Sequence, residues 1–220
     1  MIVKEPPMEP ADSGKLRASC LILAGGEGKR LTPDKPLLEI EGRPLIERVA
    51  AEVTPLFEEV LLVTNAPEKY RSLGLPHVRD DRPGCGPLMG IFSGLKKIRH
   101  ETAFVCAADM PFLRPDVIRA EFDAVTDEFD MVVPYPGGLP EFLHACYRKR
   151  CLKAMESNLD AGRLKIDMLR DCCRIRRLDR DWFLARGLEA AMERAFVNIN
   201  TLEDYQCWSR GDSRRTAAAE

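Results

Sequence analysis

The sequence lacks any apolar run that approaches the about 18 residues needed to cross a lipid bilayer. It also lacks an excess of either charge, since 33 Lys and Arg residues face 35 Asp and Glu residues and leave a net charge of −2. Such a balance provides no general attraction to nucleic acid or to acidic membranes. With 15 Gly and 16 Pro among 220 residues, the chain is not a low-complexity sequence either. We therefore expect neither a nucleic acid nor a membrane as a partner.

The eight cysteines form no CxxC motif and share no paired Cys and His spacing of the kind that binds zinc. The first residues of the chain hold several prolines and no continuous hydrophobic segment, unlike a secretory signal. We therefore expect a cytoplasmic protein with reduced thiols. Cys20, Cys106 and Cys146 lie in apolar stretches, where cysteine serves as a small buried hydrophobic residue.

What the chain does have is the composition of a globular domain, with 45% hydrophobic and 31% charged residues. Because domains average about 150 residues, this length indicates one large domain with short ends. We predict a flexible leader at residues 1–16, a single domain at 17–208 and a flexible tail at 209–220.

Short apolar segments alternate with amphipathic ones along much of the chain. The apolar segments predict strands at 19–24, 59–64, 77–80, 102–109 and 130–135. The amphipathic segments predict helices at 44–57, 88–98 and 114–125. Beyond residue 140 the regularity weakens, and we predict a strand at 143–147, helices at 148–158 and 181–194, and short strands at 173–178 and 195–199. Apolar strands that alternate with helices are typical of a three-layer α/β/α sandwich with a mostly parallel, doubly wound (Rossmann-like) sheet.

A glycine-rich loop follows the first predicted strand, and ligands of open parallel sheets bind beyond the carboxyl ends of strands. The loop, LAGGEGKRLTPDK at 23–35, has three glycines followed by Lys29, Arg30 and Lys35. Glycine lets backbone N–H groups approach phosphate oxygens, and the cations neutralise phosphate charge. The spacing matches neither the P-loop nor the GxGxxG motif. By itself the loop is equally consistent with a tight turn and solvated basic side chains.

Asp109 ends the predicted strand at 102–109 and precedes the turn-forming pair Met110 and Pro111. A carboxylate at the end of a central strand beside a phosphate-binding loop suits Mg²⁺, which prefers one or two carboxylates with phosphate and water oxygens. The alternative role of Asp109 is to cap the following helix. Its occurrence together with the glycine-rich loop favours the metal.

Four segments together resemble a known family. The segment LAGGEGKRLTPDKPLLEIEGRPLIERV at 23–49 is similar to the amino-terminal signature of nucleotidyltransferases. The segments DDRPGCGPLMGIFSGL, CAADMPFL and FVNINTLEDY resemble, in order, motifs of the molybdenum cofactor guanylyltransferases, and the resemblance spans about residues 19–205. It implies transfer of GMP from Mg-GTP to the terminal phosphate of molybdopterin that bears molybdenum, with release of pyrophosphate. GTP and molybdopterin are then the partners and Mg²⁺ is the cofactor.

The resemblance also assigns roles to residues. It places the nucleotide at Leu23, Ala24, Gly25, Gly26, Lys35, Asn65, Asp81 and Asp109, and catalysis at Arg30, Lys35 and Asp109, with Asp109 as the Mg²⁺ ligand. It places the acceptor at Gly90, Asn198 and Asn200. The asparagine amides are able to donate to a phosphate or to pterin carbonyls. The chemistry needs no general base, because the attacking phosphate is already ionised at neutral pH.

Two features are open to either a functional or a structural role. Gly90 and Gly94 lie four residues apart on the predicted helix at 88–98, where their small size allows a close approach by a flat ligand or by the sheet. His144, within the segment EFLHACY, is a candidate for contact with the acceptor. The alternative for His144 is an ordinary core or surface histidine.

Two other functions stay open. One is a cytidylyltransferase that acts on molybdopterin or on a sugar or polyol phosphate, and the other is a catalytically silent nucleotide-binding adaptor. The LAGG loop and the NIN tail favour guanine and molybdopterin, and the presence of both Lys35 and Asp109 favours a working enzyme. An association with molybdoenzyme maturation proteins is compatible with catalysis. We expect GTP to bind at 23–35, 79–90 and 107–111, and molybdopterin at 138–148 and 196–202.

Overall fold

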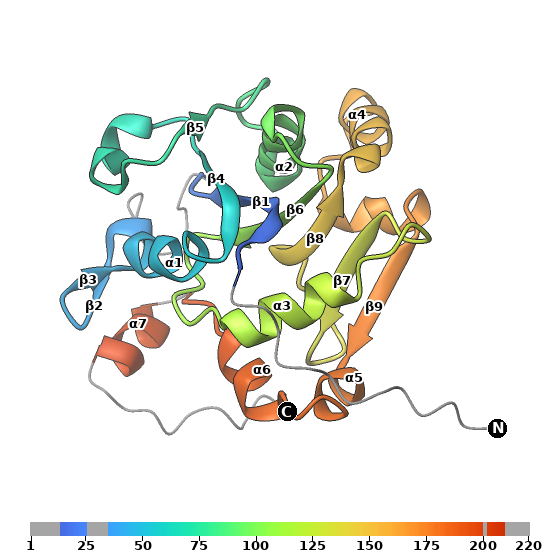
Figure 1. The fold of residues 1–220 in the computed structure, drawn as a ribbon. Helices are drawn as coiled ribbons and strands as arrows, with labels where there is room; N and C mark the ends of the chain where they lie inside the picture. Colours follow the sequence, from blue (N-terminus) through green and yellow to red (C-terminus); the bar gives the residue numbers. More distant parts are fainter. Residues whose placement is uncertain (1–13, 26–34, 200–201, 210–220) are drawn as a thin grey trace.

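The computed structural model describes residues 14–25, 35–199 and 202–209. A seven-stranded sheet forms the middle layer, and helices cover both of its faces (Figure 1). In spatial order the strands are β5 (His77–Val78), β4 (Phe57–Val63), β1 (Leu16–Leu23), β6 (Thr102–Ala107), β8 (His144–Arg148), β7 (Met131–Tyr135) and β9 (Ile175–Asp179). This architecture confirms the expected α/β/α sandwich.

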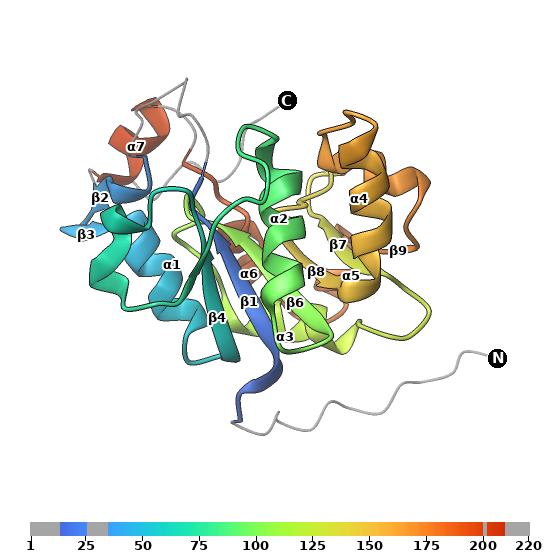
Figure 2. The same ribbon diagram turned by 90° about the horizontal axis from the view of Figure 1, so that it is seen from above.

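The helices divide between the two faces of the sheet (Figures 1 and 2). One face carries α2 (Gly86–Lys97) and α4 (Leu152–Asp160), and the other carries α1 (Leu45–Val53), α3 (Pro115–Asp123), α5 (Arg180–Leu184) and α6 (Glu189–Ala195). Helix α7 (Leu202–Ser209) contacts a small hairpin of β2 (Glu39–Ile40) and β3 (Arg43–Pro44). Single-turn or short 3₁₀ segments are η1 (Lys35–Leu37), η2 (Pro67–Leu73), η3 (Lys149–Cys151) and η4 (Ile166–Asp171). Within the described ranges no helix combines the length and apolarity that a membrane span requires.

Strand β8 is antiparallel to both of its neighbours, β6 and β7, whereas the other neighbouring strands of the sheet are parallel. Strands β1, β4, β6 and β7 therefore point the same way, and their carboxyl ends meet at one edge. Burial on both faces explains why the central strands are apolar at nearly every position. In β1, Cys20 and Ile22 face α1 and α3 and Leu21 faces α2, and none of the three has exposed surface.

The strand expected at 195–199 is wrong. Helix α6 continues to Ala195, and no strand forms between Phe196 and Ile199. The apolar side chains alternate there because they enter different cores: Phe196 packs against the core on the α3 side, and Ile199 is buried in a separate cluster that includes Phe112. The one helix expected at 181–194 is likewise two helices, α5 and α6, because Gly187 adopts a left-handed φ of 69° between them.

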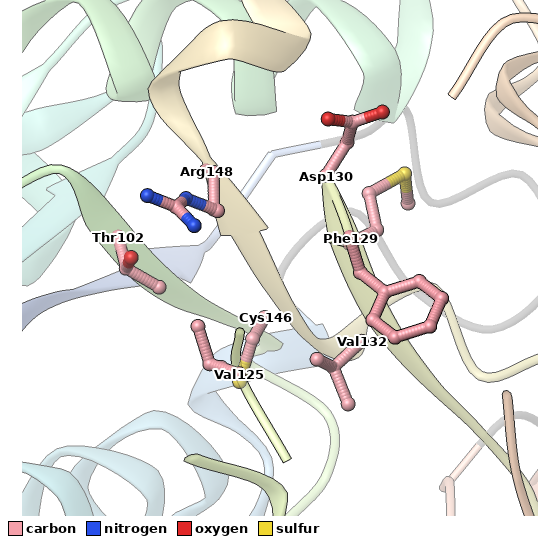
Figure 3. A pocket seen from close by; sticks show the side chains of 8 residues that line it. Thr102, Val125, Phe129, Asp130, Val132, Cys146 and Arg148 are labelled. Carbon is pink, nitrogen blue, oxygen red and sulfur yellow. The ribbon is translucent and has the colours of Figure 1, made fainter. Parts of the chain in front are cut away.

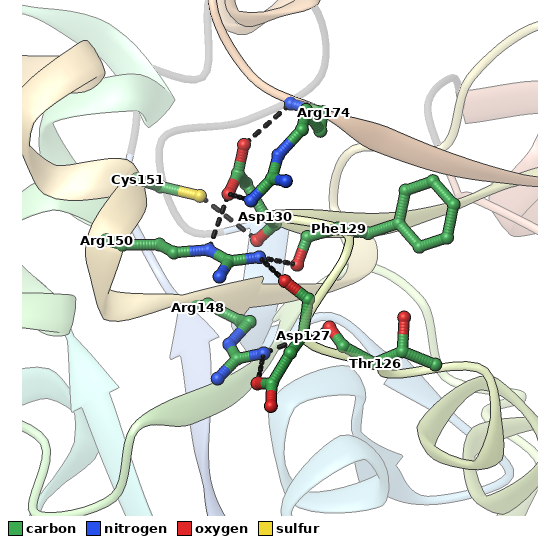
Figure 4. Close-up of polar contacts among 8 residues, drawn as sticks. All are labelled: Thr126, Asp127, Phe129, Asp130, Arg148, Arg150, Cys151 and Arg174. Carbon is green, nitrogen blue, oxygen red and sulfur yellow. Dashed lines mark hydrogen bonds and ion pairs between the residues drawn. The ribbon is translucent and has the colours of Figure 1, made fainter.

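Figures 3 and 4 show the opposite edge of the sheet, where β6 and β7 begin. A small pocket at this edge is lined by Thr102, Cys146 and Arg148 among others. Beside it the Asp130 carboxylate accepts the Arg174 backbone N–H at 2.7 Å and pairs with the guanidinium of Arg150 at 2.5 Å. Burial acts to raise the pKa of Asp130, but these two arginines outweigh it and lower the pKa. Hydrogen bonds and ion pairs between structural residues thus occupy this edge of the sheet.

Helix α2 lies close to the sheet because it carries Gly90 and Gly94. A Cβ atom on Gly94 would lie 2.6 Å from Cδ1 of Leu21 and 3.2 Å from Cγ2 of Val63, so a larger residue requires movement in the core. A Cβ atom on Gly90 would lie 3.5 Å from Oδ1 of Asp80 and from Cγ1 of Val63, which is ordinary van der Waals contact. Gly94 therefore has the packing role that the four-residue spacing of the two glycines allowed.

We predict that Gly94→Ala lowers the free energy of unfolding by about 1–3 kcal/mol, the usual cost of overpacking a filled core. The matched variant Gly90→Ala should change it by less than about 1 kcal/mol, because alanine favours a helix over glycine by about that amount. Urea denaturation of both variants measures the difference. Equal midpoints for the two variants would contradict a steric limit at Gly94.

Candidate active site

The candidate site lies beyond the carboxyl ends of three neighbouring strands, β4, β1 and β6, where open parallel sheets hold their ligands in a crevice. Backbone hydrogen bonds continue past the strands: the Ala24 N–H donates to the Val63 carbonyl at 2.9 Å, and the Ala108 N–H donates to the Leu23 carbonyl at 3.0 Å. These bonds hold the start of the glycine-rich loop between the segment that leads from β4 to Asn65 and the segment that leads from β6 to Asp109. The structure therefore brings together three segments of the chain, of which the first and the last are more than eighty residues apart in the sequence.

Lys35 and Asp109 form the charged centre of this crevice. The Lys35 ammonium lies 2.5 Å from Oδ2 of Asp109, and their side chains are 18% and 24% exposed. Oδ1 of Asp109 is buried and has no hydrogen-bond partner among the described residues. One oxygen of this carboxylate, at the end of a central strand, is therefore left without a hydrogen-bond partner from the described residues.

On the β4 side of the crevice, Asn65 and Asp80 bind each other. The Asn65 amide donates to Oδ2 of Asp80 at 2.8 Å, and its oxygen accepts the Asp80 backbone N–H at 3.0 Å. Burial raises the pKa of Asp80. Next to it, the Asp81 carboxylate pairs with Lys96 at 2.5 Å, and the Asp81 N–H donates to the buried hydroxyl of Ser93. Nucleotide contacts of Asn65 and Asp81 remain predictions, and Asp80 is a polar residue of this edge that the sequence analysis missed.

On the β8 side of the site, Glu141 lies close enough to Asn198 and Asp109 for both to affect the pKa of its carboxyl group. Burial raises the pKa of Glu141, with a further contribution from the Asp109 charge, against the opposing effects of His144 and Asn198. The backbone N–H of Ile199 donates to the Asp109 carbonyl at 3.1 Å. Glu141 was not predicted as a site residue; it lies shortly before the start of β8, which the antiparallel pairing with β6 places at this edge of the sheet.

The acceptor contact expected for His144 is wrong. Its side chain has no exposed surface, and Nδ1 lies 3.0 Å from Oε1 of Glu121, which is also fully buried. The imidazole packs against the rings of Phe104 and Phe196, with centroids 4.9 and 4.6 Å away. His144 faces α3 because alternate residues of β8 point to opposite sides of the sheet. It is therefore the core histidine that the alternative described.

The remaining predicted residues are those outside the described part of the chain and Gly90. Gly26, Arg30 and Asn200 lie outside the described residues. Gly90 is buried on α2, where a Cβ atom would lie 3.5 Å from Asp80 Oδ1 and 3.6 Å from a methyl carbon of Leu23. Contact between Gly90 and an acceptor stays a prediction.

Fold and site together define an α/β protein of the nucleotide-binding class, with charged groups and a glycine-rich loop at the carboxyl edge of parallel strands. Residues 20–175 match the family model described as the MobA-like NTP transferase domain. The chain therefore belongs to the family of MobA-like NTP transferase domains, which are nucleotidyltransferases.

Relatives that align over most of the chain agree with this family, and a solved structure shares its fold. A protein of Natranaerobius thermophilus, named "Probable molybdenum cofactor guanylyltransferase", is 34% identical over 86% of this chain and 93% of its own. The "Molybdenum cofactor guanylyltransferase" of Desulfosudis oleivorans is 33% identical over 84% and 91%. In fold, the chain is similar to the crystal structure of molybdopterin-guanine dinucleotide biosynthesis protein A from Archaeoglobus fulgidus, with a TM-score of 0.71, 24% identity and coverage of 89% and 98%.

The buried pair of His144 and Glu121 leads to a prediction on stability. We expect His144→Ala to lower the free energy of unfolding by about 3–5 kcal/mol, because Glu121 would be left buried without its partner. The double variant Glu121→Met, His144→Phe replaces both groups by apolar ones of similar size and should be the more stable of the two. Urea denaturation tests this order. A loss below about 1 kcal/mol in His144→Ala would contradict a structural pair.

Proposed function

We propose that this protein transfers GMP from Mg-GTP to the terminal phosphate of Mo-molybdopterin, which yields the guanine dinucleotide cofactor and pyrophosphate. Relatives named for this activity align with 86% and 84% of the chain, which supports these substrates. The observation that carries the proposal is the pair of Lys35 and Asp109 at the carboxyl end of β6. Transfer between phosphates requires a cation for the phosphate oxygens and a carboxylate for a metal ion, and this pair provides both.

Asp109 suits Mg²⁺ by the chemistry of its surroundings. Its Oδ1 lacks a hydrogen-bond partner among the described residues, and carboxylate oxygens are preferred Mg²⁺ ligands. The Glu141 carboxyl group lies close enough for the charge of Asp109 to raise its pKa, so a second acidic side chain is near the proposed metal ligand. When bound, Mg²⁺ offsets the charge of the triphosphate and of the departing pyrophosphate.

Lys35 supplies the positive charge that the phosphates need. Its ammonium pairs with Asp109. Phosphate oxygens accept charge-assisted hydrogen bonds from lysine, so a bound triphosphate competes with Asp109 for the ammonium. Lys35 then neutralises the phosphates, and the carboxylate of Asp109 is left for the cation.

The reaction itself moves no proton. An oxygen of the ionised acceptor phosphate attacks the α-phosphorus of GTP, a new P–O bond forms, and the bond to the bridging oxygen breaks as pyrophosphate leaves. The protein contributes by holding two anions in line and by neutralising their charge. This agrees with a crevice in which the described residues place no histidine, since His144 is in the core.

The two substrates are proposed to occupy opposite sides of Asp109. The nucleotide side comprises the ends of β1 and β4 with Asn65 and Asp81, and the acceptor side comprises Glu141 and Asn198. Support comes from the geometry, because an in-line attack requires the acceptor to approach opposite the leaving group.

The choice of base is the first test of this function. We predict that GTP with Mg²⁺ binds at least about tenfold more tightly than CTP, a difference of about 1.4 kcal/mol that one or two hydrogen bonds supply. Isothermal titration with GTP, CTP, ATP and UTP measures it. Equal affinities, or tighter CTP binding, would favour a cytidylyltransferase instead.

The metal site is tested by Asp109→Asn, which keeps the size of the side chain and removes its charge. We expect a loss of turnover of at least about a hundredfold, the scale seen when one electrostatic group is removed from a reaction centre. The matched control is Asp116→Asn on the surface at the start of α3, which should stay within about twofold because such surface pairs contribute little. Pyrophosphate release at several Mg²⁺ concentrations is the assay. Normal turnover in a folded Asp109→Asn protein would place the metal elsewhere.

A further inference from the structure

The short hairpin that follows Lys35 lies outside the central sheet. Lys35 begins η1, the Leu38 N–H donates to its carbonyl at 3.1 Å, and the chain then continues into β2 and β3. These two strands pair with each other in a sheet of their own, separate from the seven strands of the main sheet. Strand pairing in the main sheet therefore fixes the position of Asp109 but does not fix that of Lys35.

Helix α7, the last helix of the described chain, contacts this hairpin (Figure 1). The Tyr205 hydroxyl donates to the backbone carbonyl of Glu39 in β2 at 2.9 Å. The next residue of β2, Ile40, is almost fully buried in a small hydrophobic cluster against which Tyr205 packs. One hydrogen bond and one set of apolar contacts thus hold the hairpin to α7.

The same helix contacts the segment that follows Asp109. The ring of Trp208 lies against that of Phe112, with centroids 4.3 Å apart. Phe112 belongs to the same small cluster as the hairpin, together with Ile199, whose N–H donates to the Asp109 carbonyl at 3.1 Å. Tyr205 and Trp208 are three residues apart and so share one face of α7. That face contacts both segments that carry the charged pair.

We propose that Tyr205 and Trp208 are positioning residues, which fix the placement of Lys35 relative to Asp109 by holding the hairpin and the segment after β6 on one face of α7. Both charged groups act on one triphosphate, and a displacement of about 1 Å is enough to cost about a hundredfold in rate. The effect on GTP rests on the proposed function. The coupling between α7 and the charged pair does not.

The first test is Tyr205→Phe, which removes one hydroxyl and keeps the ring in the cluster. We expect the KM for GTP to rise about threefold, the effect of one ordinary hydrogen bond, because the hairpin that carries Lys35 is less well held. The KM for the acceptor should stay the same, since the lost bond reaches only the hairpin. An equal rise in both KM values, or no change in either, would overturn the proposal.

The second test compares Trp208→Ala with Trp208→Phe. We expect the alanine variant to raise the KM for GTP about tenfold, and the phenylalanine variant to restore most of the affinity because it keeps an aromatic pair beside Asp109. The matched control is Trp182→Ala on α5, since Trp182 is also half-buried but packs on Phe183 and Arg186 in a different core. The same rise in Trp182→Ala would overturn the proposal, because a general loosening of the fold would then explain it.

A readout without substrates separates this inference from the proposed function. The urea midpoints of the wild type, Lys35→Ala, Trp208→Ala and the double variant form a double-mutant cycle. We expect Lys35→Ala to shift the midpoint less than about half as much in the Trp208→Ala background as in the wild type, because residues joined in one network are not additive. Tyr205→Phe replaces Trp208→Ala in the cycle if the latter does not fold.

Additive shifts of the midpoint would overturn the proposal, since α7 would then have no influence on the pair of Lys35 and Asp109. Coupled midpoints in a protein that does not transfer GMP would instead refute the proposed function alone.

Discussion

The pairing of β1 with β6 is the constraint on which the candidate site depends. Leu23 lies opposite Ala107, and the next bond joins the Ala108 N–H to the Leu23 carbonyl, so the glycine-rich loop and Asp109 leave the sheet side by side. The register is strongly specified because both strands are buried on both faces, and a slip of one residue would exchange the two faces. The position of the charged groups is therefore set by apolar packing beneath them.

Two pairs of neighbouring polar side chains show how burial separates structure from function. Lys35 and Asp109 are 18% and 24% exposed, and one carboxylate oxygen has no partner among the described residues. His144 and Glu121 have no exposed surface at all. The first pair is able to exchange its partner for a phosphate or a cation, whereas the second is locked between α3 and β8. His144 still helps to hold the site in place, because its backbone N–H donates to the Glu141 carbonyl and its ring packs against that of Phe196.

Much of the fold was predictable because the central strands and the first helices have strong periodicities. The strand predicted at 195–199 was wrong, because Phe196 and Ile199 alternate like strand residues but enter two different cores. The break between α5 and α6 was not predicted, because Phe183 and Met192 face the same core on either side of Gly187. In both places the apolar pattern predicts correctly which side chains are buried. Burial alone does not determine which backbone hydrogen bonds form.

The sequence by itself determined the layers of the fold, the alternation of strands and helices up to about residue 140, and the likeness of four segments to one family. Only the tertiary structure decided between neighbouring residues of the segment EFLHACY. Glu141 lies close enough to Asp109 for that charge to raise its pKa, whereas His144, three residues later, enters the core beside Glu121. The reason is physical: which side of β8 faces the crevice depends on its antiparallel pairing with β6 and on the packing of α3, both of which join residues far apart in the chain.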